Sequence, residues 1–300
     1  MGALTYHPPV VPGNDQARIL DLHEMARASQ QVIEGTAGEV LPQLLRAGGS
    51  PGGARSKVLV GVCGDSILSG EDDLPPGYTH WIVKFQTRQD SPDAGPGGAG
   101  LLPDGERRRP RDAAHASLRD TSERAVLRGR AVRPPGQSPL SRAHLGNLIQ
   151  SNFRIPSCDY RQLLEVTRIL TRNHQDVLEC YRRMVFNVLT HNRDDHVKNF
   201  AFRLTDEGTW ELAPAYDLVF SPGPGGEHTM TVDGEGRTPG RSHLLKLAGP
   251  AGLSSRDAQT ILDEVASAAA RWRAHARQAG VGRKATKTVG DAIEECLARL

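Results

Sequence analysis

Residues 191 to 200, HNRDDHVKNF, gather acidic, amide, imidazole and ammonium side chains into ten positions. Asp194 and Asn199 have the spacing D-x-x-x-x-N, and a third oxygen donor, Asp217, follows in PAYDLV. In such a set, one carboxylate can accept the proton of an attacking hydroxyl, while an amide oxygen and a second carboxylate hold magnesium on nucleotide phosphates. The pattern therefore indicates a phosphoryl-transfer site.

Two other interpretations of these ten residues are open. An isolated D-x-x-x-x-N also arises by chance, because Asp and Asn favour turns for local reasons. A metal site built from His191, Asp195 and His196 is the chemical alternative, although histidines five apart in a loop do not match the four-residue helical spacing of zinc sites. A metal hydrolase using Asp194, Asp195 and His196 predicts activity without ATP. Otherwise Asp195 and His196 are expected to support the site rather than to react.

The elements that must position these groups are predicted from periodicity. The segments YRQLLEVTRIL and DVLECYRRMVFNVLTHN predict two helices, and the second has an apolar stripe at spacings of three and four. Asn173, followed three residues later by Asp176, predicts an N-terminal cap. NFAFRL and TWELAPAYDLVF predict a hairpin around TDEG. This hairpin would bring Asn199 and Asp217 to one end. A capped helix starting near Ser254 and a last helix ending at Leu300 complete the chain.

The N-terminal part contains groups that suit phosphate binding. Strands are predicted at 58–62 and 79–85, and a glycine-rich stretch, SPGGARSK, precedes the first of them. Backbone N–H groups of such a turn can surround phosphate oxygens, and Gly52 and Gly53 permit close approach. Lys84 on the second strand would supply a point charge. The alternatives are a flexible turn and a solvated lysine on an edge strand.

Residues 90–143 differ from the rest of the chain, because they contain no aromatic residue, no isoleucine and no lysine. Such a segment buries too little apolar area to offset its ordering entropy, so we expect it to be irregular. A disordered insertion, a basic interaction tail and a stretch translated out of frame from GC-rich DNA are three interpretations.

Composition limits the class of protein. The chain has 300 residues, of which 38% are apolar and 24% charged, and its net charge of +2 gives no case for a nucleic-acid-binding surface. Four cysteines without a CxxC pair favour reduced thiols. Because neither a signal-peptide pattern nor a run of 18 apolar residues is present, we expect a cytoplasmic protein with no membrane partner.

The motifs resemble those of HipA-type serine/threonine kinases, the toxins of HipBA toxin–antitoxin modules. MVFNVLTHNRDDHVKNFAF and WELAPAYDLVFS are similar to the C-terminal region of that family, from about Leu145 to the last helices. SPGGARSKVLV and WIVKF resemble its glycine-rich loop and its phosphate-lysine strand. Compared with the family, we expect the chain to lack the β-rich N-terminal subdomain, and 90–143 has neither the sequence of the adenine-contacting hinge nor an RFDR-like motif.

The resemblance implies a role for each matching residue. Asp194 is the catalytic aspartate, and Asn199 and Asp217 are the magnesium ligands. ATP-binding groups are Lys84, Gly52, Gly53, Lys57, His196 and Lys198. Ser50 matches the regulatory serine that family members autophosphorylate.

The implied fold is α+β and kinase-like, with two lobes. Residues 1–89 form a partial small lobe, 90–143 an irregular segment, and 144–300 a mainly helical catalytic lobe. The implied activity is ATP- and magnesium-dependent phosphorylation of a protein serine or threonine. The family suggests aminoacyl-tRNA synthetases as substrates and a HipB-like antitoxin as partner, with DNA reached only through that antitoxin. The alternative function is an impaired remnant that acts as an antitoxin-binding module.

Overall fold

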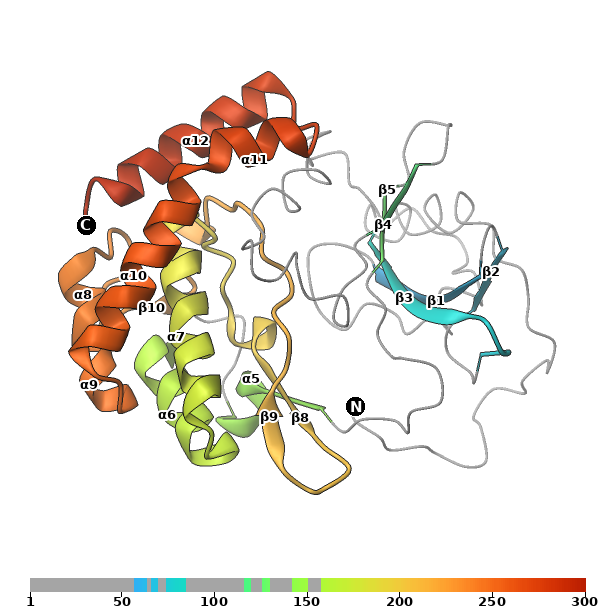
Figure 1. Cartoon of the computed structure of the whole chain (residues 1–300), viewed down its shortest axis with the longest axis horizontal. Helices are drawn as coiled ribbons and strands as arrows, with labels where there is room; N and C mark the ends of the chain where they lie inside the picture. The colour runs from blue at the N-terminus through green and yellow to red at the C-terminus, as the bar shows by residue number, and fades with distance from the viewer. Residues whose placement is uncertain are drawn as a thin grey trace. The chain divides into compact units, whose positions relative to one another are not determined.

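The computed structural model describes residues 57–63, 66–69, 74–84, 116–119, 126–129, 142–150 and 158–300 (Figure 1). These residues fall into two compact units, one containing strands β1 to β5 and the other containing everything from β6 onward. Ser50, Gly52 and Gly53 lie outside the described residues.

The first unit is built on an antiparallel sheet of order β2-β1-β3, formed by β1 (Lys57–Cys63), β2 (Ser66–Ser69) and β3 (Thr79–Lys84). β1 and β3 match the two strands that alternation and β-branched content predict. Val60 and Leu68 are buried. The register makes Lys57 and Lys84 direct partners across β1 and β3.

Two short strands lie within the segment that composition predicts to be irregular. β4 (Ala116–Arg119) pairs with β5 (Val126–Gly129) in antiparallel register, with Leu118 opposite Leu127. These strands have little local signal, since only Val126 among their eight residues is of a type enriched in strands.

The second unit contains the predicted hairpin, now part of a three-stranded antiparallel sheet. β6 (Arg142–His144), β8 (Ala201–Leu204) and β9 (Trp210–Leu212) have the order β6-β8-β9, with Phe202 opposite Leu212. β9 ends earlier than the predicted strand 209–220. Pro214 follows within two residues and has no N–H to continue the ladder. Asp217 therefore lies in the loop after the strand rather than at its end.

The two predicted helices before the hairpin are present. α6 (Tyr160–Thr171) begins at Asp159, whose carboxylate accepts from the Arg161 N–H at 2.8 Å. α7 (His174–Leu189) begins at the predicted cap, where the Asn173 side chain accepts from the Gln175 N–H at 3.0 Å. Asp176 instead accepts from the Leu212 N–H at 3.1 Å. This bond ties β9 to the first turn of α7.

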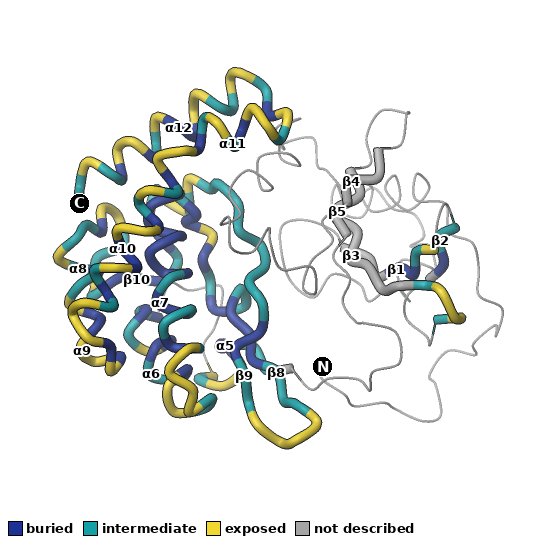
Figure 2. Tube along the Cα trace, in the orientation of Figure 1, coloured by how far each residue is buried: buried dark blue, intermediate teal, exposed yellow. Residues whose placement is uncertain are grey.

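Helix α7 is the centre of the second unit. It packs against α6, α10 (Ser255–Ala270) and α12 (Arg283–Leu297), and Figure 2 shows it as buried along much of its length. The predicted apolar stripe, including Val177, Met184 and Val188, is within the core. The remaining elements are α5 (Leu145–Leu148), β7 (Cys158–Asp159), η1 (Val197–Asn199), η2 (Pro224–Gly226), β10 (Met230–Thr231), α8 (Arg241–Lys246), α9 (Ala248–Ala251) and α11 (Trp272–Gln278).

The sequence also led to predictions about membrane-spanning segments and about the state of the cysteines. Within the described ranges, no helix combines the length and the apolar character needed to cross a membrane. All four cysteines are free thiols, of which Cys158, Cys180 and Cys296 are buried.

The start of α10 gives a stability prediction. The Ser254 hydroxyl accepts from the Asp257 N–H at 3.1 Å and donates to the Asp257 carboxylate at 2.6 Å. Ser254→Ala is therefore expected to lower the free energy of unfolding by about 1 kcal/mol, the usual cost of losing such a cap. Chemical denaturation measures this change. Ser255→Ala, one residue further in an exposed position, is the control and should change stability by less than about 0.5 kcal/mol.

Candidate active site

The loop from Thr190 to Phe200 contains the candidate catalytic residues and follows directly from the buried end of α7. The Asp194 side chain is 55% exposed. The Asn199 side chain donates to the backbone carbonyl of Asp194 at 2.6 Å. The D-x-x-x-x-N spacing thus closes a loop in which the asparagine amide fixes the backbone of the aspartate. The Asp194 carboxylate faces solvent, where a substrate hydroxyl can reach it.

His196 and Lys198 lie in the same loop, as the sequence places them. The His196 Nε2 atom is 3.8 Å from the Asp194 carboxylate, and its buried Nδ1 has no hydrogen-bond partner among the described residues. The Lys198 carbonyl accepts from the Tyr216 hydroxyl at 2.6 Å and lies 2.9 Å from His144 Nδ1. These contacts tie the loop to β6 and to the segment after β9.

Asp217 is held beside this loop by a second set of backbone contacts. Ser221 donates its N–H to the His191 carbonyl at 3.0 Å, and the Arg193 N–H donates to the Ser221 carbonyl at 3.3 Å. The Asn192 amide donates to the Asp217 carbonyl at 3.5 Å. Asp217 has a φ of 55°, a left-handed conformation that Asp and Asn tolerate better than most residues. The two loops therefore lie side by side although β9 ends well before Asp217.

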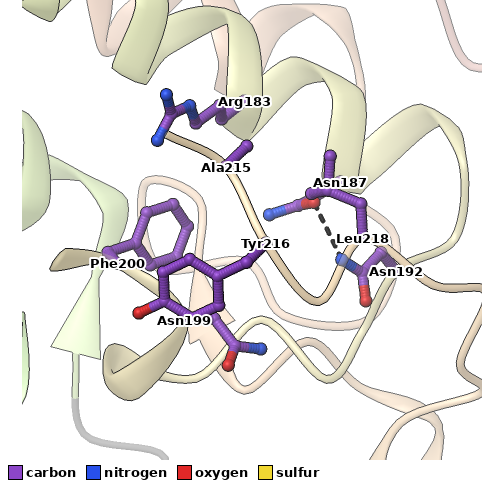
Figure 3. Close-up of a pocket in the computed structure, with 8 residues that line it drawn as sticks. All are labelled: Arg183, Asn187, Asn192, Asn199, Phe200, Ala215, Tyr216 and Leu218. Atoms are coloured by element: carbon purple, nitrogen blue, oxygen red, sulfur yellow. Dashed lines mark hydrogen bonds between the residues drawn. The ribbon is translucent and has the colours of Figure 1, made fainter. Parts of the chain in front are cut away.

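A small pocket with both polar and apolar lining residues lies where α7 meets the two loops (Figure 3). Asn187, Asn192 and Asn199 contribute amides, and Tyr216 and Leu218 are the sequence neighbours of Asp217. The remaining lining residues are Arg183, Phe200 and Ala215. Amide and carboxylate oxygens are hard donors that suit magnesium, which keeps several waters and uses few protein ligands. The donor set of Asn199 and Asp217 therefore fits magnesium.

Two residues of the alternative metal site, Asp195 and His191, make contacts with other side chains of the protein. Asp195 is fully buried and accepts from the Tyr160 hydroxyl, His228 Nδ1 and the Thr229 N–H, each at 2.8 Å. His191 stacks on Phe220 with ring centroids 5.4 Å apart. In the part of the chain that the structure describes, no three His, Cys, Asp or Glu residues are grouped to hold a metal ion.

Several groups that hold the loop in place were not predicted from the sequence. The Arg193 guanidinium donates to the Gly226 carbonyl at 2.6 Å and to the Arg237 carbonyl at 2.8 Å. Tyr160 and His228 are more than thirty positions from Asp195, so no local pattern indicates their pairing. The sequence predicted a supporting role for Asp195 but not its partners.

The half-buried His191 side chain predicts how the stability of the protein depends on pH. Burial, with the charges of Arg193 and His228, lowers the pKa of its imidazole from 6.5 to about 4. The unfolded chain therefore binds this proton more readily than the folded chain does between about pH 6.5 and 4. The stabilisation from keeping the ring neutral is complete above that window and is lost as the pH falls through it. The free energy of unfolding should thus be lower at pH 5 than at pH 7.

The variant His191→Asn tests this cause, because asparagine tolerates the φ of 56° at this position. Urea unfolding at the two pH values should show a smaller difference for the variant than for the original chain. An unchanged difference would contradict the assignment to His191.

The predicted phosphate-binding lysines lie in the first unit, on β1 and β3. The register pairs Lys57 with Lys84 across the two strands. Asp194, Asn199, Asp217, His196 and Lys198 all belong to the second unit.

Comparison with known proteins confirms the resemblance indicated by the motifs. Residues 140–272 match the family model of the HipA-like C-terminal domain. The chain is 34% identical over 122 residues to a Sinorhizobium fredii protein described as "Putative kinase Y4dM". That alignment covers 39% of this chain and 29% of the relative, so the chain spans less than a third of the relative's length.

The fold is similar to that of solved structures. One is the complex of HipA, HipB and operator DNA from Shewanella oneidensis MR-1, with a TM-score of 0.69 and 16% identity over 98% of this chain and 73% of that chain. A second is the proinflammatory kinase CtkA of Helicobacter pylori, with a TM-score of 0.47 and 9% identity over 87% of this chain and 92% of that one. The first likeness confirms the predicted α+β fold with its mainly helical C-terminal unit.

Proposed function

Because residues 140–272 match the HipA-like C-terminal domain, we propose that this chain transfers the γ-phosphoryl group of ATP to a serine or threonine of a protein. One observation carries the proposal. The exposed Asp194 carboxylate lies on a loop that Asn199 closes, and that loop is bonded to the segment containing Asp217. Asp194, Asn199 and Asp217 are of the residue types that protein kinases use as the base and as magnesium ligands, which supports the proposal.

In the proposed reaction, Asp194 accepts the proton of the attacking hydroxyl, whose oxygen bonds to the γ-phosphorus while the bond from that phosphorus to the β,γ-bridging oxygen breaks and ADP leaves. Asn199 and Asp217 would hold the magnesium ion. When bound, magnesium neutralises charge on the phosphate oxygens. The protein contributes mainly by positioning, because transition states of phosphoryl transfer need little covalent help.

The ATP phosphates are proposed to bind the glycine-rich stretch with Gly52 and Gly53, together with Lys57 and Lys84. The register of β1 and β3 supports this placement, since it makes the two lysines partners. His196 and Lys198 of the catalytic loop are further proposed ATP-binding groups. Ser50, at the start of the glycine-rich stretch, is the proposed site of autophosphorylation.

We further propose that the chain is the kinase of a toxin–antitoxin module and works in the cytoplasm. The partner is then a HipB-like antitoxin, as in the Shewanella complex, and aminoacyl-tRNA synthetases are the proposed substrate class. A net charge of +2 supports DNA contact through the antitoxin rather than through this chain.

Transfer of γ-labelled phosphate in magnesium tests the function. The full chain is incubated with labelled ATP, with and without a mixture of purified aminoacyl-tRNA synthetases. Label is expected on a synthetase, and on Ser50 if autophosphorylation occurs, and EDTA should prevent both. Label on Ser50 alone would support the kinase and reject the substrate class. Absence of any transfer, combined with tight capture of a HipB-like protein, would favour the antitoxin-binding remnant.

A further inference from the structure

A buried carboxylate lies next to the candidate catalytic residue in sequence. Asp195 has no exposed surface and receives hydrogen bonds from both side chains and backbone. Its Oδ2 accepts from Tyr160 and His228 at 2.8 Å, and its Oδ1 accepts from the N–H groups of Thr229 at 2.8 Å and Met230 at 3.4 Å. A buried carboxylate is costly unless its oxygens are paired in this way.

The hydrogen bonds continue from Tyr160 toward the second loop. The Tyr160 hydroxyl accepts from the Asn187 amide at 2.9 Å, and the Asn187 oxygen accepts from the Asn192 amide at 2.9 Å. Figure 3 shows this last bond as a dashed line at the edge of the pocket. The same Asn192 amide lies 3.5 Å from the Asp217 carbonyl. One buried polar chain thus runs from Asp195 to the segment of Asp217.

Asp194 is fixed on both sides while its own carboxylate remains exposed. Before it, the Arg193 side chain is bonded to the carbonyls of Gly226 and Arg237. After it, Asp195 is anchored in the core. A satisfied polar network in a low-dielectric interior specifies one arrangement of the groups that it joins. A displacement of a reacting group by about 1 Å can lower the reaction rate about a hundredfold.

We propose that Asp195, Tyr160 and His228 form a positioning cluster that holds the catalytic loop and thereby aims Asp194. The kinetic part of this proposal rests on the proposed function, whereas the structural part does not. Tyr160 is the residue to change, because its hydroxyl both donates to Asp195 and accepts from Asn187. Tyr160→Phe removes one oxygen and keeps the ring that meets Phe200 edge-on, with centroids 5.8 Å apart.

The chain offers a matched control in Tyr181→Phe. Tyr181 is equally buried, and its hydroxyl donates to the Leu244 carbonyl at 2.9 Å, away from the loop. Both variants lose a buried hydroxyl and are expected to lose similar stability. Only Tyr160→Phe should lower kcat, by about tenfold or more, with the KM for ATP changed by less than about twofold. In an Asp194→Asn background, Tyr160→Phe should have little further effect. An equal loss of kcat in both backgrounds, or in Tyr181→Phe, would overturn the proposal.

Amide hydrogen exchange tests the cluster independently of activity. In Tyr160→Phe, the amides of residues 191–199 are expected to exchange at least about tenfold faster than in the original chain, while those of α10 stay unchanged. Tyr181→Phe should leave residues 191–199 as protected as before. Unchanged exchange of the loop in Tyr160→Phe would refute the cluster, even if the chain proved to have no kinase activity. Faster exchange of the loop without any phosphoryl transfer would support the cluster and would refute only the proposed function.

Discussion

Replacement of Asp194 by asparagine is expected to lower the rate of phosphoryl transfer by about 10²–10⁴-fold, the usual contribution of a general base. Asparagine has nearly the same shape but cannot accept the proton of the substrate hydroxyl. The fold should be unaffected, because the Asp194 side chain is exposed and the bond from Asn199 goes to its backbone carbonyl. ATP affinity should also be retained, since the proposed phosphate and metal ligands are other residues. Initial rates with labelled ATP and calorimetric ATP binding measure the two quantities.

The control for this variant is Asp206→Asn. Asp206 is an exposed acid in the turn between β8 and β9, in the same unit as Asp194. Its replacement removes the same charge and should change the rate by less than about twofold. If the rate of Asp194→Asn stayed within tenfold of the rate of the original chain, Asp194 would not be the base, even though the chain would be an active kinase.

The second large effect is expected at Asp217. Asp217→Asn should weaken ATP binding in magnesium by about 10- to 100-fold or more, because loss of the carboxylate removes the charged metal ligand. Asparagine is preferred to alanine here because it tolerates the φ of 55°. A change in affinity then reports on the ligand rather than on a strained backbone. Magnesium titration of ATP binding should show the same weakening.

Asp233→Asn is a matched control, since Asp233 is also an aspartate with positive φ, at 52°. Its carboxylate is paired with Arg161 at 2.8 Å and Lys246 at 3.4 Å rather than placed beside the catalytic loop. ATP affinity should therefore be unchanged in this variant. Equal weakening in both variants would attribute the effect to the fold and would reject Asp217 as a metal ligand.

The sequence predicted those parts of the fold that depend on local patterns. The apolar stripe of α7, the caps at Asn173 and Ser254 and the turn between β8 and β9 are encoded within a few residues. Asp194 and Asn199 could be singled out for the same reason, because their spacing is short. The prediction placed Asp217 by extending the second strand of the hairpin as far as residue 220. Pro214 ends that strand early, and backbone hydrogen bonds to residues 191–193 hold the loop instead.

Other features depend on residues that are distant in sequence. Tyr160, His228 and Arg237 contact the catalytic loop from separate elements, and none has a periodic or motif signal of its own. Contacts across more than thirty residues are fixed by packing and not by local preference. β4 and β5 are close in sequence, but they lie in a segment whose average composition favours irregular structure, so they were not predicted.

Calorimetric titration of the full chain with ATP, in magnesium and in EDTA, tests the central claim most directly. If the chain is an ATP- and magnesium-dependent kinase, saturable binding should occur in magnesium and should weaken at least about tenfold when EDTA removes the metal. Absence of binding by the folded chain at about 1 mM ATP, the upper end of usual KM values, would contradict the kinase function. The residues HNRDDHVKNF would then form a kinase-like loop that this chain does not use for phosphoryl transfer.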